Sequence, residues 1–118
     1  MKRVYVAGAY SAGNVIAVLD NMRRGMRASV EVFLAGYAPF CPWLDYQFTL
    51  MLRGDEKLTV QNYYEYSLAW LEASSVVLIL PNSEHSVGTQ NEIKRANDLN
   101  IPVFYSLEDL KNAVPAQG

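Results

Sequence analysis

The chain has 118 residues, of which 51% are hydrophobic and 19% charged, and its formal net charge at pH 7 is -2. A chain of this length and composition has enough apolar side chains for one core, so we expect a single domain over residues 1–118. The small negative charge disfavours nucleic acid and anionic membrane surfaces as partners, because both reward clustered Lys and Arg.

The apolar runs are too short for a membrane span. None reaches the roughly 18–20 residues that cross a bilayer, and the opening MKRVYVAGAY lacks the long apolar segment of a secretory signal. We therefore expect no membrane association and a cytoplasmic location. One cysteine, Cys41, and one histidine, His85, supply neither an internal disulfide nor a zinc ligand set, so no metal is expected.

Strands and helices are predicted to alternate in the first half of the chain. The β-branched and aromatic run 2–10 predicts a buried strand followed by a turn. Residues 18–35 have apolar side chains at helical spacing and end before Gly36, which favours a helix with a glycine cap. The predicted apolar stripe is Leu19, Met22, Met26, Val30 and Phe33. Residues 37–42 predict a short strand bounded by prolines, and 43–61 a loop or partial helix.

The second half continues the alternation. Helical spacing in 62–75 precedes VVLIL, a run without polar alternation that predicts a central strand buried on both faces. A helix over 88–99, a strand over 101–105 and a last helix begun by Ser106 complete the pattern. This order predicts an α/β fold, a flavodoxin-like or Rossmann-like three-layer sandwich with a parallel sheet of four or five strands.

Ligands of such sheets bind at the carboxyl ends of the strands. Three loops are expected there: 7–14, 41–46 and 81–89. Gly8 and Gly13 in the first have the spacing of neither a dinucleotide-binding nor a P-loop motif, which makes those functions weak predictions. The third loop places Ser83, Ser86, Gly88 and Thr89 just before a helix, where free N–H groups favour an anion.

Glu92 follows that loop and allows two interpretations. The sequence TQNE fits a capping box, in which Thr89 caps the helix and Glu92 bonds back to its backbone. Alternatively, Glu92 lies beside Ile93 on the side that faces the sheet, which would bring its carboxylate to the crevice. Capping boxes are common and catalytic acids are few, so spacing alone favours capping without excluding catalysis.

Four stretches of the chain belong together: YVAGAYSAGN, GYAPFCPWL, LAWLEASSVVLILPNSEHSVGTQNEIKRA and IPVFYSLEDL. Taken together they resemble the nucleoside 2-deoxyribosyltransferase-like superfamily, and most closely its short bacterial and phage branch of the DUF4406/DUF7768 type. The resemblance spans nearly the whole chain and keeps its order. Similar enzymes cleave or transfer at the N-glycosidic bond of nucleosides or 5'-monophosphates through a glutamate nucleophile, without a metal or organic cofactor.

The resemblance assigns roles to particular residues. In the pattern S-x-G-x-x-x-E, Ser86 and Gly88 precede Glu92, which takes the place of the catalytic glutamate. Gly8 and Tyr10 match the first-loop motif that lines the sugar and base pocket, although Ala9 stands where relatives usually carry proline. With Ser11 forming part of the same wall and Thr89 adding a donor, the implied partner is a small nucleoside or nucleotide, with a slight preference for nucleotides.

One position departs from the family. Relatives usually carry an aspartate in D-L-x-W-L, where this chain has Ser67, and a serine cannot act as a carboxylic general acid. The substitutes open to the chain are Asp45, Glu65 and His85, with Asp45 our choice as second catalytic residue. The alternative function is a non-catalytic nucleotide-binding or sensor module that has lost an acid.

The resemblance and the composition also bear on assembly. Relatives complete their pockets across subunit interfaces, and the aromatic surplus in WLDYQFTLM and YYEY exceeds what so small a core needs. We therefore expect a homodimer or larger homo-oligomer with these segments near the contact. Trp43 is expected to pack, with base stacking as its second interpretation.

Overall fold

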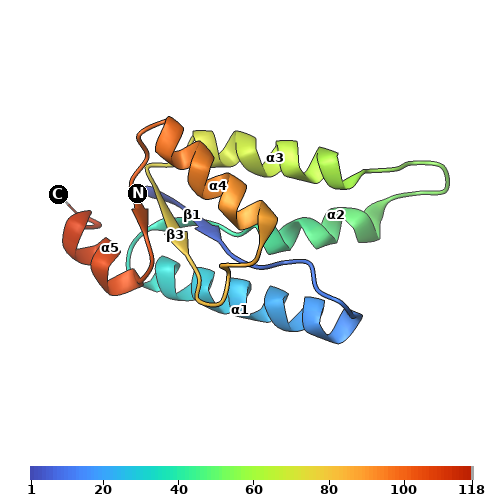
Figure 1. The fold of residues 1–118 in the computed structure, drawn as a ribbon, viewed down its shortest axis with the longest axis horizontal. Coiled ribbons are helices and arrows are strands. Elements are labelled where there is room, and N and C mark those ends of the chain that lie inside the picture. The colour runs from blue at the N-terminus through green and yellow to red at the C-terminus, as the bar shows by residue number, and fades with distance from the viewer. Residues whose placement is uncertain (118) are drawn as a thin grey trace.

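The fold, seen in a computed structural model that describes residues 1–117, is a four-stranded sheet between two layers of helices (Figure 1). The strands are β1 (Arg3–Ala7), β2 (Ala38–Phe40), β3 (Val76–Ile79) and β4 (Val103–Phe104). The helices are α1 (Val15–Leu34), the 3-10 turn η1 (Pro42–Asp45), α2 (Tyr46–Met51), α3 (Val60–Glu72), α4 (Val87–Asp98) and α5 (Leu107–Ala113). The α/β prediction with four or five parallel strands is confirmed.

All strand pairs are parallel, and their order across the sheet is β2-β1-β3-β4. The two central strands are buried along nearly their whole length, which is why their sequences lack polar alternation. The short outer strands β2 and β4 are only partly buried. In β4, only two of the five residues predicted as strand pair with the sheet.

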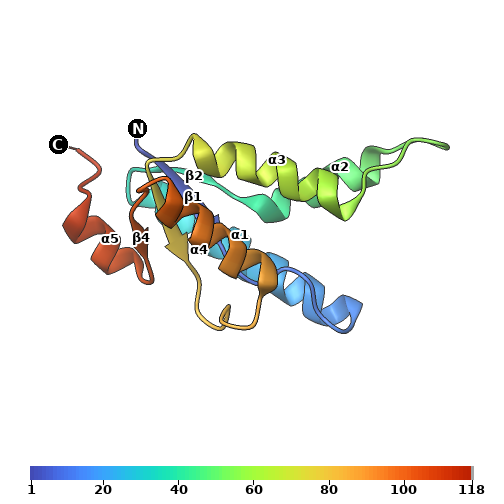
Figure 2. The same cartoon turned by 45° about the horizontal axis from the view of Figure 1, so that its top comes forward.

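Alternate residues of β1 face opposite helix layers. Val4 and Val6 pack with residues of α1 and α5, whereas Tyr5 and Ala7 pack with residues of α3 and α4. Figure 2 shows the two layers from a second angle. From β1 the chain crosses one face of the sheet through α1 to reach β2, and from β3 it crosses the other face through α4 to reach β4. The direction in which strands are added to the sheet therefore reverses between β1 and β3. The crevice outside their carboxyl ends is the usual ligand position of such sheets.

The inner face of α1 differs from the predicted apolar stripe. Val30 and Phe33 are 46% and 63% exposed, whereas Gly25 and Ser29 are buried. The cause is Trp43, since a Cβ on Gly25 would lie 2.2 Å from its indole ring. Small residues must therefore face the sheet here, which a count of apolar positions cannot detect.

Candidate functional site

Glu92 lies in the second turn of α4, on the side facing the sheet, and is 9% exposed. Its Oε2 accepts a hydrogen bond from the hydroxyl of Tyr5 in β1. Capping of α4 is performed by Ser86, whose side chain accepts from the backbone N–H of Thr89 at 3.2 Å. The capping-box interpretation of Thr89 and Glu92 is therefore wrong. The helix begins three residues earlier than TQNE implies, so Glu92 lies beyond reach of the cap.

Burial governs the ionisation of Glu92. Loss of solvent raises its pKa to about 7, and the hydrogen bond from Tyr5 opposes that rise by stabilising the carboxylate. Near neutral pH the group is thus poised between acid and carboxylate. A poorly solvated carboxylate held by a single donor can serve as a nucleophile or as a proton carrier.

Three further side chains lie near the Glu92–Tyr5 pair. Burial, the Glu92 charge and the Glu92 hydrogen bond raise the pKa of Tyr5, and a hydrogen bond with Ser67 opposes them. Ser67, which the resemblance aligns with an aspartate, is 8% exposed and lies beside Tyr5. Burial and the nearby Glu92 also raise the pKa of Tyr64, which hydrogen-bonds with Asn91.

Tyr5, Tyr64 and Asn91 did not emerge from the sequence as site residues. Tyr5 offered one signal, because a tyrosine in the middle of a buried strand needs a partner for its hydroxyl. Nothing in the sequence named that partner, which lies 87 positions away. The other two lie on different helices, and only the packing of α3 against α4 brings them together.

A second carboxyl group lies at the end of η1. Asp45 is half-buried, and its Oδ1 accepts a hydrogen bond of 2.9 Å from the hydroxyl of Tyr10 in the β1–α1 loop. Burial raises the pKa of Asp45, while the Tyr10 hydrogen bond opposes the rise. The Asp45 charge also contributes to the raised pKa of Tyr5. Asp45 and Tyr10, which were predicted separately as site residues, are therefore in contact with each other, and Asp45 lies within electrostatic range of Tyr5.

The loops after β1 and β3 are joined directly. The backbone N–H of Ala9 donates to Oγ of Ser83 at 3.2 Å, and Ser83 is 3% exposed. Trp43 donates from Nε1 to the carbonyl oxygen of Ala9 at 3.1 Å and is 1% exposed, so it packs and has no open face for a base. A Cβ on Gly8 would lie 3.1 Å from Leu80 and 3.2 Å from Trp43, so Gly8 allows this close packing.

The remaining candidates differ in accessibility. Ser11 and Gly88 are exposed and Ser86 is partly so. Thr89 is 1% exposed, and its hydroxyl donates to Oγ of Ser86 at 2.9 Å, so this hydroxyl is already engaged within the helix start. The two other substitutes considered for the family aspartate, His85 and Glu65, are exposed, and Glu65 accepts a hydrogen bond from Gln61.

Two features are absent from the described residues. Between Met1 and Gln117, no cluster of three or more His, Cys, Asp or Glu side chains could hold a metal ion. Within the same part of the chain, no helix is both long enough and apolar enough to cross a membrane.

Fold and site together define a doubly wound, flavodoxin-like α/β protein with a buried glutamate beside its central strands. The chain belongs to the family described as "Domain of unknown function (DUF7768)", whose model matches residues 2–106. Its fold is similar to a solved structure of a 2-deoxyribosyltransferase from the psychrotolerant bacterium Bacillus psychrosaccharolyticus. The TM-score is 0.61 at 12% identity, covering 86% of this chain and 69% of that one. No curated protein matches the sequence.

Proposed function

We propose that this protein binds a nucleoside or 5'-nucleotide and cleaves or transfers at its N-glycosidic bond, with Glu92 as nucleophile. One observation carries the proposal: Glu92 is buried, has a pKa of about 7 and is hydrogen-bonded to Tyr5 beside the central strands. The fold similarity to a 2-deoxyribosyltransferase supports the class of substrate.

In the proposed reaction, the Glu92 carboxylate attacks the anomeric carbon as the bond from that carbon to the base nitrogen breaks. The electron pair of the broken bond leaves with the base, which takes up a proton. Water or a second base then displaces the carboxylate from the glycosyl ester. Tyr5 holds the carboxylate in place, and Ser86 and Gly88 at the start of α4 orient the sugar or phosphate. Thr89, which is buried and hydrogen-bonded to Ser86, holds Ser86 in position. Gly8, Tyr10 and Ser11 form the opposite wall.

Asp45 is the proposed proton donor to the leaving base. Ser67 occupies the family aspartate position but lacks a carboxyl group. Burial raises the pKa of Asp45, which increases its protonated fraction near neutral pH, and its contact with Tyr10 fixes its position. Of the three substitutes considered from the sequence, Asp45 alone is half-buried and bonded to another candidate site residue.

The test is base release, followed by chromatography over a panel of deoxynucleosides and their 5'-monophosphates. We expect Glu92→Gln to reduce release by orders of magnitude, because an amide cannot form the glycosyl ester. Glu84→Gln is the matched control, since Glu84 is an exposed acid in the loop before α4. Release at the wild-type rate by Glu92→Gln would overturn the nucleophile assignment.

A non-catalytic nucleotide-binding or sensor module is the second candidate, and the presence of Ser67 in place of an acid favours it. The same panel separates the two. Wild-type protein that binds nucleotides by calorimetry but releases no base would support the sensor.

We also propose that the protein forms homo-oligomers through α2 and α3. The exposed apolar residues of this region are Leu44, Tyr46, Phe48, Leu50, Met51, Leu58, Val60 and Trp70. So many exposed apolar side chains in one region, from η1 through α2 to α3, are typical of an interaction surface.

A further inference from the structure

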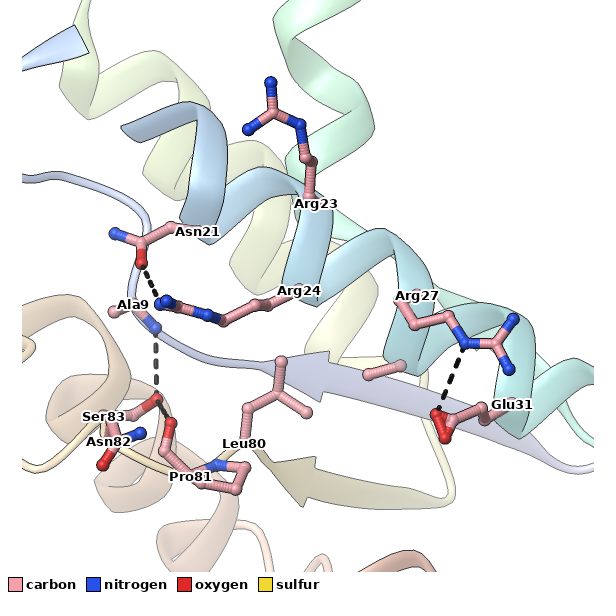
Figure 3. A pocket seen from close by; sticks show the side chains of 11 residues that line it. Ala9, Asn21, Arg23, Arg24, Arg27, Glu31, Leu80, Pro81, Asn82 and Ser83 are labelled. Carbon is pink, nitrogen blue, oxygen red and sulfur yellow. Dashed lines mark hydrogen bonds and ion pairs between the residues drawn. The ribbon is translucent and has the colours of Figure 1, made fainter. Parts of the chain in front are cut away.

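A cavity of about 540 Å³ lies on the α1 side of the sheet, and neither Glu92 nor Tyr5 lines it. Its walls come from α1 and from the loops after β1 and β3 (Figure 3). The hydrogen bond from Ala9 to Ser83, which both line the cavity, joins these two loops. Glu92 instead belongs to the α3–α4 side, where Tyr5 packs. The cavity therefore lies on the opposite side of the sheet from Glu92, although it shares these two loops with the candidate active site.

The cavity combines an apolar floor with positive charge. Ala9, Ala28, Leu80 and Pro81 provide the apolar part. Three arginines and one glutamate of α1 are the charged residues that line it, namely Arg23, Arg24, Arg27 and Glu31. This excess of positive charge contrasts with the net charge of -2 of the whole chain. The volume suits a small organic ligand.

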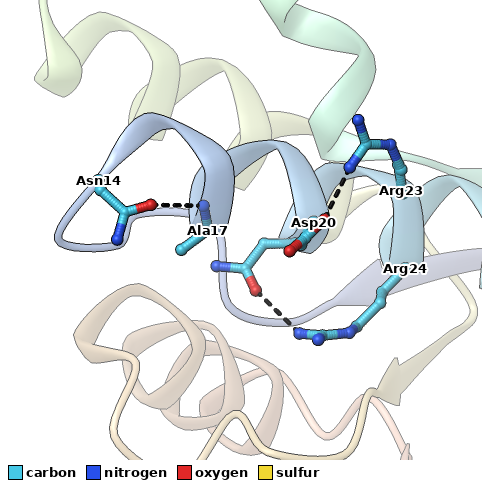
Figure 4. A network of polar contacts seen from close by, with 6 residues as sticks. Asn14, Ala17, Asp20, Arg23 and Arg24 are labelled. Atoms are coloured by element: carbon cyan, nitrogen blue, oxygen red, sulfur yellow. Dashed lines mark hydrogen bonds and ion pairs between the residues drawn. The ribbon is translucent and has the colours of Figure 1, made fainter.

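The arginines differ in how their charges are balanced. Arg23 pairs with Asp20 at 2.7 Å, and Arg27 approaches Glu31 at 3.8 Å. Among the described residues, Arg24 has no carboxylate partner and only a long hydrogen bond of 3.4 Å to Oδ1 of Asn21 (Figure 4). Of the three arginines that line the cavity, Arg24 is thus the one whose charge no carboxylate of residues 1–117 neutralises.

Asn21 sets the direction of Arg24. The Asn21 amide donates to the carbonyl oxygen of Tyr10 at 3.1 Å, which turns its own oxygen toward the guanidinium. In Figure 3 the Arg24 side chain accordingly extends toward Ala9, near the joined loops, whereas Arg23 points away from Ser83. An arginine held in this way presents its free N–H groups to a ligand in the cavity. A phosphate is the group that this planar, permanently charged fork matches best.

We propose that this cavity is a second binding site, for a phosphate monoester with an apolar or ring-shaped ester group. Arg24 binds the phosphate, and the ester group lies against Leu80 and Pro81. The site goes beyond the proposed glycosidic reaction, because neither Glu92 nor Asp45 takes part in it.

The test uses three probes: inorganic phosphate, phenyl phosphate and phenol. Each is titrated into the 15N-labelled protein, and amide and arginine side-chain NMR shifts are followed. We expect phenyl phosphate to bind more tightly than inorganic phosphate, and phenol not to bind. The shifts should gather at Ala9, Arg24, Leu80 and Ser83.

Matched variants test whether the charge of Arg24 binds the phosphate. Arg24→Gln should raise the Kd for phenyl phosphate about tenfold or more, the effect of losing a charge-assisted hydrogen bond. Arg53→Gln makes the same charge change in the loop between α2 and α3, outside the cavity, and should leave the Kd within about twofold. Glu92→Gln should bind phenyl phosphate like the wild type while losing base release.

Three outcomes would overturn the site. Equal losses in Arg24→Gln and Arg53→Gln would mean a general charge effect, and shifts centred on Tyr5 and Glu92 would place the ligand in the candidate active site. Equal affinities for inorganic and phenyl phosphate would remove the role of the apolar floor. None of these results affects the base-release assay, so the two proposals can fail separately.

Discussion

At the scale of single residues, the candidate site contains two hydrogen-bonded carboxyl–tyrosine pairs. Glu92 bonds to Tyr5 and Asp45 bonds to Tyr10, and burial raises the pKa of both acids. Tyrosine is a neutral donor, so it fixes a carboxylate without lowering its pKa as far as an arginine would. Both acids therefore bind a proton more strongly than a fully solvated carboxyl group does.

The raised pKa of Glu92 predicts a pH-dependent cost in stability. Below pH 4.5, its ordinary value, the group is protonated in both folded and unfolded protein and costs nothing. Between 4.5 and about 7 it ionises only in the unfolded chain, so stability falls as pH rises. Above that range, the loss stays constant at about 3 kcal/mol.

Urea denaturation of the wild type and Glu92→Gln between pH 4 and 8 measures this cost, because other titrating groups cancel in the difference. We expect the free energy of unfolding of Glu92→Gln, minus that of the wild type, to increase by about 3 kcal/mol as the pH rises from 4 to 8. A difference that does not change with pH would contradict the raised pKa.

The proposed acid role of Asp45 predicts a dependence on the leaving group. Asp45→Asn should slow base release about 100-fold or more, because the base must depart with a proton. An aryl deoxyriboside whose phenolate leaves without a proton should be cleaved at nearly the wild-type rate. Equal losses with both substrates, measured by chromatography, would indicate a structural role for Asp45.

At the scale of elements, caps and close approaches set the local structure. Asn14, Thr59, Ser86 and Ser106 each cap a helix through a side-chain oxygen. Gly36 adopts a φ of 97°, as its predicted role in ending α1 requires. These signals are local, so the sequence predicts the existence and type of most elements. It misses the start of α1 by three residues and the cap of α4 by the same number.

The contact between α1 and η1 predicts a large effect of one methyl group. Gly25→Ala would place a Cβ 2.2 Å from the Trp43 ring, and the ring is confined by its bond to Ala9. We expect a loss of about 1–3 kcal/mol in the free energy of unfolding, measured in urea. Gly13→Ala is the control, since no atom lies within 4 Å of the added Cβ. Equal effects at the two glycines would mean that backbone flexibility, and not the Trp43 contact, is responsible.

At the scale of the whole molecule, the shape is elongated, with extents of 48 × 26 × 25 Å. The arm formed by α2, the N-terminal part of α3 and their connecting loop extends beyond the sheet (Figures 1 and 2), whereas the C-terminal part of α3, with Ser67 and Leu71 buried, packs over the sheet. An arm rich in exposed apolar side chains is costly in a monomer and is typical of a surface that a second copy covers.

Substitutions on the arm test the proposed self-association. We expect the wild type to be a dimer or larger in light scattering at micromolar concentrations, and Leu50→Glu with Met51→Glu to lower the mass to that of a monomer. Phe33→Glu on α1, where the side chain is 63% exposed, should leave the mass unchanged. A monomeric wild type would remove the proposal, and dissociation by Phe33→Glu alone would move the contact to α1.

The sequence by itself determined the alternation of strands and helices, the parallel sheet and the buried central strand, because hydrophobic period and turn residues are local properties. That strand is predicted over 76–80 and observed over 76–79. The sequence also brought Glu92 and Asp45 forward as candidates. Only the tertiary structure showed that Glu92 bonds to Tyr5, that Asp45 bonds to Tyr10 and that Ser86 caps α4. Partners across the sheet depend on how helices pack against strands. Burial, which sets the pKa of a carboxyl group, exists only once those layers have closed around it.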